Sequence, residues 1–125
     1  MSKDMFDKIF RRKEEKDEFK KNDKPIEIEV DGLGIFKFKK ITASEFKDIV
    51  DSDSENKDAE LLYYQCIEPN VKDKDFLQRM GATSEPDMVF EKFLQPSEMS
   101  QISGIILKES KIIMNTVQLV KEVKN

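Results

Sequence analysis

The sequence contains no histidine, only one cysteine and only four glycines among its 125 residues. Without histidine, the chain cannot form a Ser-His or Cys-His nucleophile pair or a histidine-ligated metal site. With Cys66 alone, it cannot form an intramolecular disulfide or a cysteine-only zinc site. None of the glycines falls in a G-x-G-x-x-G or G-x-x-x-x-G-K pattern, so no nucleotide site is predicted. We therefore expect a binding or assembly protein that is not an enzyme and holds no cofactor or metal.

Long apolar runs are also absent from the sequence. No run approaches the roughly 20 apolar residues that a membrane-spanning helix needs. The charged start, Met1 to Lys8, lacks the apolar core of an export signal. A single cysteine is typical of proteins in a reducing compartment. These features together predict a cytoplasmic location and no membrane partner.

Charge is abundant but nearly balanced. The chain has 22 basic and 26 acidic residues, for a net charge of −4, and charged and hydrophobic residues each make up 38%. This composition suffices for one domain with one modest core. Basic clusters such as Arg11-Arg12-Lys13 and Lys20-Lys21 have acidic neighbours, so we expect no nucleic-acid partner.

The N-terminal segment, residues 1–24, is dense in charges of both signs. Its apolar residues Met5, Phe6, Ile9 and Phe10 are spaced by three and four positions, which predicts a helix with a short apolar stripe. We expect an amphipathic helix that is partly docked on the domain. Two interpretations stay open: a solvated arm that caps the domain, or a helix that binds a partner.

A β-hairpin is predicted next. Residues 26–30 alternate between apolar and acidic side chains, and residues 36–39 alternate between phenylalanine and lysine. The turn residues 31–34 separate these two strands. Because a lone hairpin is marginally stable, its apolar face must pack on helices. Thr42-Ala43-Ser44-Glu45 then forms a capping box at the start of a short helix.

The sequence predicts four further helices. The first covers 59–68 and is capped by Asp58, and the second covers 73–81 and ends at Gly81. The third is capped by Ser84, and the last and longest begins at Pro96. Residues 111–125 are expected to extend the last helix, with a terminal strand as the alternative. The fold class is therefore α+β: an N-terminal β-hairpin packed on a cluster of four to five mostly short helices, with residues 25–110 as the core domain.

Several residues invite a chemical role, and for most of them a structural role is favoured. Cys66 lies in an apolar stretch, where burial would quench its thiol, so we expect a small core residue. Tyr63 and Tyr64 could both be core residues, or one of them could point outward and anchor an interface, and the sequence leaves this open. The acidic loop 51–57 lacks both the glycine and the final glutamate of a calcium-binding EF-hand loop, so we expect a solvated loop.

The stretch from Tyr63 to Ile106 resembles the XkdN-like family of phage tail assembly chaperones. The residues that carry the resemblance are Tyr64-Gln65-Cys66-Ile67-Glu68-Pro69-Asn70-Val71-Lys72-Asp73, Phe76-Leu77-Gln78, Gly81, Asp87-Met88-Val89, Phe93-Leu94, Pro96-Ser97-Glu98 and Gln101-Ile102-Ser103-Gly104. The preceding hairpin and capping box agree with the family in order and spacing. Residues 2–21 and the tail after Ser110 have no counterpart in it.

The resemblance implies a non-enzymatic protein of a contractile-tailed phage, a prophage or a phage-tail-like bacteriocin. Members are thought to hold the aggregation-prone tape-measure protein while tail-tube subunits assemble, and they are generally absent from the finished particle. A tape-measure protein is thus the expected partner, with the tail-tube protein as a second. The alternatives are a small structural or adaptor subunit of such a particle and a DNA-binding regulator that dimerises through its last helix.

Three apolar groups are candidates for partner binding. They are the stripe Phe6, Ile9 and Phe10; the face Val89, Phe90 and Phe93; and the heptad-like row that includes Ile106 and Ile113. The last row, which Met99 and Val120 extend, recurs every seven residues and predicts a homo-oligomer.

Overall fold

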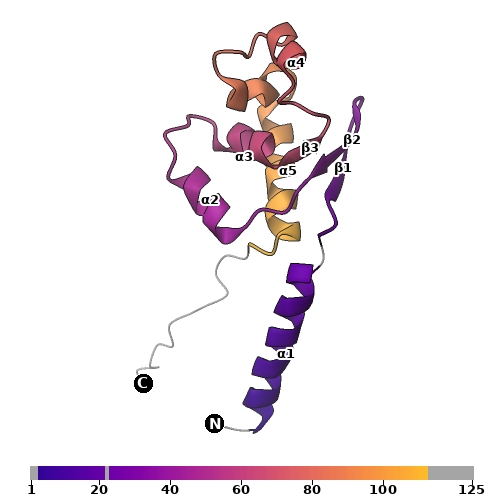
Figure 1. Ribbon diagram of the computed structural model, residues 1–125, viewed down its shortest axis with the longest axis vertical. Coiled ribbons are helices and arrows are strands. Elements are labelled where there is room, and N and C mark those ends of the chain that lie inside the picture. The colour runs from indigo at the N-terminus through magenta and orange to yellow at the C-terminus, as the bar shows by residue number, and fades with distance from the viewer. Residues whose placement is uncertain (1–2, 22, 113–125) are drawn as a thin grey trace, which may run out of the picture.

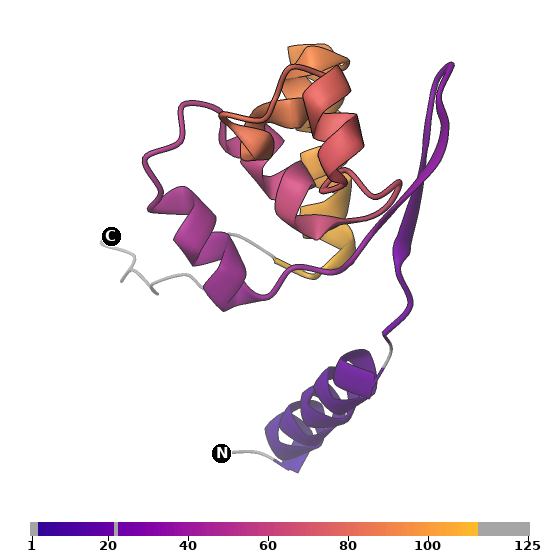
Figure 2. The same ribbon diagram turned by 45° about the horizontal axis from the view of Figure 1, so that its top comes forward.

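The computed structural model describes residues 3–21 and 23–112. Its elements are α1 (Lys3–Lys21), β1 (Ile26–Val30), β2 (Gly34–Phe38), α2 (Ala43–Val50), α3 (Lys57–Gln65), β3 (Cys66–Glu68), α4 (Lys74–Arg79), the 3-10 helix η1 (Pro86–Lys92) and α5 (Pro96–Glu109). The predicted α+β class is confirmed. The strands and all helices after α1 form one body, and α1 extends away from it (Figures 1 and 2).

The predicted hairpin is confirmed, although β2 begins at Gly34, which was assigned to the turn, and ends at Phe38. Ile28 pairs with Phe36, and side chains along β1 are alternately buried and exposed, as the apolar–acidic alternation requires. Gly32 adopts a φ of 79° in the turn, a conformation that glycine tolerates without strain. On the outer face, Lys37 Nζ lies 3.8 Å from the Glu27 carboxylate and 3.7 Å from that of Glu68.

A third strand was not predicted. The helix expected over 59–68 ends at Gln65, and Cys66–Glu68 form β3, which pairs antiparallel with β2. The residue before a proline disfavours helical backbone, so Pro69 favours an extended Glu68. The Lys39 amide donates to the Gln65 carbonyl over 2.8 Å and holds the end of α3 against the sheet. The prediction failed because a long apolar run alone does not distinguish a helix from a helix followed by a buried strand.

Helix starts were predicted with mixed success. The capping box is confirmed: the Glu45 amide donates to Thr42 Oγ1 over 3.1 Å, and the Thr42 amide donates to Glu45 Oε1 over 3.0 Å. The expected cap at Asp58 was wrong, because Asn56 Oδ1 accepts from the Ala59 amide instead. The expected cap at Ser84 was also wrong, since a 3-10 helix begins at Pro86 with no side-chain cap.

Aromatic residues from the hairpin and η1 meet in the core. The Phe90 ring centroid lies 6.3 Å from that of Phe36, 6.4 Å from that of Phe38 and 5.2 Å from that of Phe93. These separations suit aromatic packing. The apolar face of the hairpin is thus covered by η1, which in turn packs on α3.

The last helix, α5, passes through the body and buries Met99, Ile102 and Ile106. It begins at Pro96 as predicted, but at 14 residues it is shorter than the 19 residues of α1. Ser110 closes it, and Ser110 Oγ accepts a hydrogen bond of 2.9 Å from the buried Ile41 amide. The predicted extension over 111–125 lies mostly outside the described residues.

Candidate binding surface on the N-terminal helix

The helix α1 is continuous because its sequence contains neither glycine nor proline and is rich in good helix formers. Oppositely charged side chains four residues apart add local support. Lys8 Nζ lies 3.2 Å from Asp4 Oδ2, and Lys13 Nζ lies 2.9 Å from Asp17 Oδ2. The latter hydrogen bond raises the pKa of Lys13 and lowers that of Asp17.

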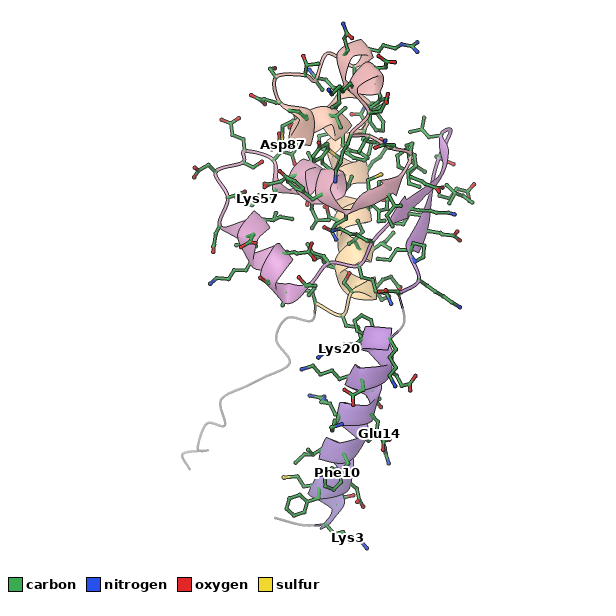
Figure 3. All side chains as sticks on the ribbon, viewed as in Figure 1. Lys3, Phe10, Glu14, Lys20, Lys57 and Asp87 are labelled. Atoms are coloured by element: carbon green, nitrogen blue, oxygen red, sulfur yellow. The ribbon has the colours of Figure 1, made fainter. Side chains whose placement is uncertain are left out.

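None of the described residues of α1 is buried, and this includes its apolar side chains. Phe6, Ile9 and Phe10 are 42%, 49% and 58% exposed, and the rings of Phe6 and Phe10 stack with centroids 6.5 Å apart. We call these three residues, with the neighbouring Met5, the α1 stripe. The predicted stripe is therefore confirmed, and α1 is only partly docked on the body, as expected, because the half-buried Phe19 contacts the body and the stripe does not. Figure 3 shows Phe10 near the end of α1 that is far from the body.

The contact between α1 and the body that involves Phe19 lies at the opposite end of the helix. Lys40 Nζ lies 4.5 Å and Lys111 Nζ 5.1 Å from the centroid of the half-buried Phe19 ring. Such cation–π contacts contribute about 0.5–1 kcal/mol each at partly exposed sites. Phe19 thus contacts the body at the base of α1, and the stripe lies about three helical turns beyond it.

The predicted binding face of Val89, Phe90 and Phe93 was wrong. Val89 and Phe90 are fully buried, and Phe93 is half-buried against the same aromatic cluster. These side chains pack against the apolar face of the hairpin and shield it from water. The sequence pattern showed a one-sided apolar stripe correctly but did not show what lies against it.

The heptad-like row was also misinterpreted. Met99 and Ile106 lie in the core of the same chain, so Ile106 is not a surface residue that a second copy could contact. Ile113 and Val120 lie outside the described residues. Met99 and Ile106 therefore give no support to the hypothesis of dimerisation through this row.

Two exposed apolar residues at the hairpin tip were missed. Leu33 is 55% and Ile35 62% exposed. The alternation of β2 could have revealed Ile35, because it is out of step with the buried Phe36 and Phe38 and shares the outer face with Lys37. Tyr64 is also exposed, whereas Tyr63 is half-buried, which settles the alternative that the sequence left open.

Cys66 is a core residue, as predicted. Its thiol donates to the Pro69 carbonyl over 3.3 Å, and burial raises its pKa to about 12. We expect the thiol of the native protein to react with Ellman's reagent at pH 8 on the order of a thousandfold more slowly than in urea, because the thiolate is the reactive form. Equal rates in the two conditions would contradict this placement.

Hydrogen bonds within the chain hold the acidic loop 51–57 in place. Lys57 Nζ donates to the Ser52 carbonyl over 2.7 Å and to the Ile49 carbonyl over 3.3 Å. Next to it, Ser52 Oγ donates to Glu60 over 2.7 Å. A lysine ammonium thus lies beside the carbonyl oxygens of this loop. In the described part of the chain, no group of three or more acidic or cysteine side chains is arranged to hold a metal ion.

One hollow lies between α2 and α3, and a second lies where α1 meets the body beside Phe19 and Lys40. Charges of both signs line the first hollow, and Lys39 Nζ lies 3.4 Å from the Glu45 carboxylate. The buried Gln65 side chain reaches its wall, but Nε2 donates to the Lys39 and Lys40 carbonyls over 3.2 and 3.1 Å. The amide therefore joins α3 to the chain leaving β2, which is a structural role.

Comparison of the chain with models of known protein families, with curated proteins and with solved structures finds no match. Among residues 3–21 and 23–112, the structure contains no helix that is both long and apolar enough to cross a membrane.

Proposed function

We propose that this protein is a tail assembly chaperone of a phage or phage-tail-like particle, and that it binds the tape-measure protein through the α1 stripe. The observation that carries the proposal is the exposure of Phe6, Ile9 and Phe10 on a helix that buries none of its described residues. Exposed apolar side chains gathered on one face mark an interaction surface. The resemblance to the XkdN-like family supplies the identity of the partner.

The parts of the chain have separate roles in this proposal. The residues that resemble the family most specifically, Tyr64 to Asp73, run from α3 through β3 to the cap of α4 and include the buried Gln65, Cys66 and Val71. These three buried side chains belong to the scaffold, whereas Tyr64 and Ile67 of the same stretch are exposed. The α1 stripe lies outside that stretch and provides the contact with the client, by packing helix against helix.

The size of the stripe suits reversible binding. Fully burying an exposed large apolar side chain contributes about 1.5–3 kcal/mol. Phe6, Ile9 and Phe10 are already about half covered, so burying what remains of the three contributes roughly 2–5 kcal/mol in total. Association costs an estimated 4–15 kcal/mol in lost freedom and side-chain ordering, so the stripe by itself supports at most weak binding. A chaperone that must release its client in the host cytoplasm, before the tail is complete, requires such weak binding.

Co-expression with a tape-measure protein from the same genome tests the proposal. We expect the tape-measure protein to become soluble and to co-purify with this chain, and we expect mass spectrometry of purified particles to lack it. A tape-measure protein that stays insoluble and never co-purifies would contradict the proposal. Stoichiometric presence in the particles would instead indicate a structural subunit.

A further inference from the structure

The face of α1 that carries the stripe changes from apolar to basic along the helix. With 3.6 residues per turn, side chains seven positions apart lie on the same face. Lys13 and Lys16 follow Phe6 and Ile9 by seven residues, and Lys20 follows Lys13 by seven. The face is therefore apolar in its first half and basic in its second half, nearer the body. Figure 3 shows Phe10 and Lys20 at these two levels of α1.

The basic half is available for an acidic partner. Among residues 3–21 and 23–112, no carboxylate lies within ion-pair distance of Lys16 or Lys20, and both side chains are exposed. Asp17 is the carboxylate on this face; it is bound to Lys13, and the nearby charges of Lys16 and Lys20 also contribute to lowering its pKa. The opposite face, which holds Asp4, Lys8, Arg11, Glu15 and Glu18, mixes both signs. With Lys13, Lys16 and Lys20 against the single carboxylate of Asp17, this face carries a net positive charge beside the apolar stripe.

We propose that α1 binds an amphipathic helix of a client protein in which acidic residues come first and the apolar stripe follows, so that the two helices are antiparallel. This inference rests on the proposed function and specifies the client segment. Phe6 and Lys20 are about 21 Å apart along the axis at 1.5 Å per residue. The matching client segment is therefore about 15 residues long.

The antiparallel direction follows from electrostatics. In that orientation the client's acidic residues lie opposite Lys16 and Lys20, and they occupy the first turns of the client helix. Carboxylates at a helix N-terminus are stabilised by the helix dipole. The N-terminal end of the client also meets the C-terminal end of α1, so the two dipoles attract. A parallel client would need its carboxylates in its last turns, where the dipole disfavours them.

A membrane surface is the less suitable occupant. A helix that lies in a bilayer interface presents an apolar face along most of its length. On α1 that face is apolar over only its first half, and Asp17 interrupts the second half. An anionic bilayer would repel this carboxylate.

Binding of two labelled synthetic peptides to the full-length protein tests the inference. Both are 16 residues long and share one composition, one with glutamates in its first two turns and leucines after them, the other in reverse order. We expect the acidic-first peptide to bind about tenfold more tightly, by fluorescence anisotropy. The Lys16→Gln/Lys20→Gln variant should lose about that factor, since two partly shielded ion pairs contribute about 1.4 kcal/mol together.

The Lys8→Gln/Arg11→Gln variant is the matched control, because it removes the same charge from the opposite face of α1. We expect its affinity for the acidic-first peptide to change less than twofold. Equal losses in the two variants, equal binding of the two peptides, or no binding of either would overturn the inference. So would a preference for phosphatidylglycerol vesicles over both peptides, or a dimer mass by light scattering that Lys16→Gln/Lys20→Gln abolishes.

The same variants separate this inference from the proposed function. If the tape-measure protein co-purifies equally well with the Lys16→Gln/Lys20→Gln variant and the wild type, the electrostatic inference fails and the chaperone function stands. If the acidic-first peptide binds as expected but no tape-measure protein co-purifies, the binding mode stands and the proposed client is wrong.

Discussion

A Phe90→Ala variant should lose about 3–5 kcal/mol of unfolding free energy, the usual cost of removing a fully buried phenylalanine. Phe90 contacts the rings of Phe36, Phe38 and Phe93, so its loss leaves a cavity between the hairpin and η1. Domains of this size have total stabilities of about 5–15 kcal/mol. We therefore expect the urea midpoint, followed by circular dichroism, to fall steeply and the variant to be partly unfolded at 37 °C.

Phe10→Ala is the matched control for this measurement. Phe10 is exposed on α1, and surface substitutions away from special features usually change stability by less than about 0.5 kcal/mol. The urea midpoint of this variant should equal that of the wild type. If the two variants are equally stable, the assignment of Phe90 to the core and Phe10 to the surface is wrong.

The triple variant Phe6→Gln, Ile9→Gln and Phe10→Gln should lose client binding by more than about a hundredfold. Aromatic and aliphatic anchors at a helical interface each contribute about 1–2 kcal/mol or more, and this variant removes three together. Glutamine is a good helix former, so α1 itself should persist. Pull-down of the tape-measure protein measures the loss, and circular dichroism verifies the helix.

A second triple variant controls for the general loss of exposed apolar surface. Leu33, Ile35 and Val50 are as exposed as the stripe residues but lie on the hairpin tip and at the end of α2. Their replacement by glutamine should leave client binding unchanged. Loss of binding in this control, with retention in the α1 variant, would move the client site from α1 to the body.

Local patterns were sufficient to predict much of the fold. Strict alternation predicted the strands and the turn between them, because a period of two has no helical interpretation. The reciprocal Thr42 and Glu45 hydrogen bonds depend on residues three positions apart and need no tertiary information. The α1 stripe was predicted for the same reason, since its spacing alone defines the face.

The failed predictions of binding surfaces concern what lies opposite a helical face. Phe90 and Phe10 both lie in apolar stripes. The sequence pattern of a stripe does not show whether residues of the same chain or of another protein pack against it. For Phe90 the cover is the hairpin of the same chain, whose apolar face contacts it through Phe36 and Phe38. Ile106 was misassigned for a similar reason: a seven-residue repeat is also what the buried side of a single core helix produces.

The contacts of Phe19 at the base of α1 contribute only modestly to fixing the orientation of that helix. Two contacts at Phe19 of about 0.5–1 kcal/mol each amount to only a few times the thermal energy. A bound client can therefore reorient α1 about its end near Phe19 at a small cost in free energy, while the rest of the molecule keeps its structure. Under the proposed function, one molecule therefore binds successive segments of a long client with α1 at different angles to the body.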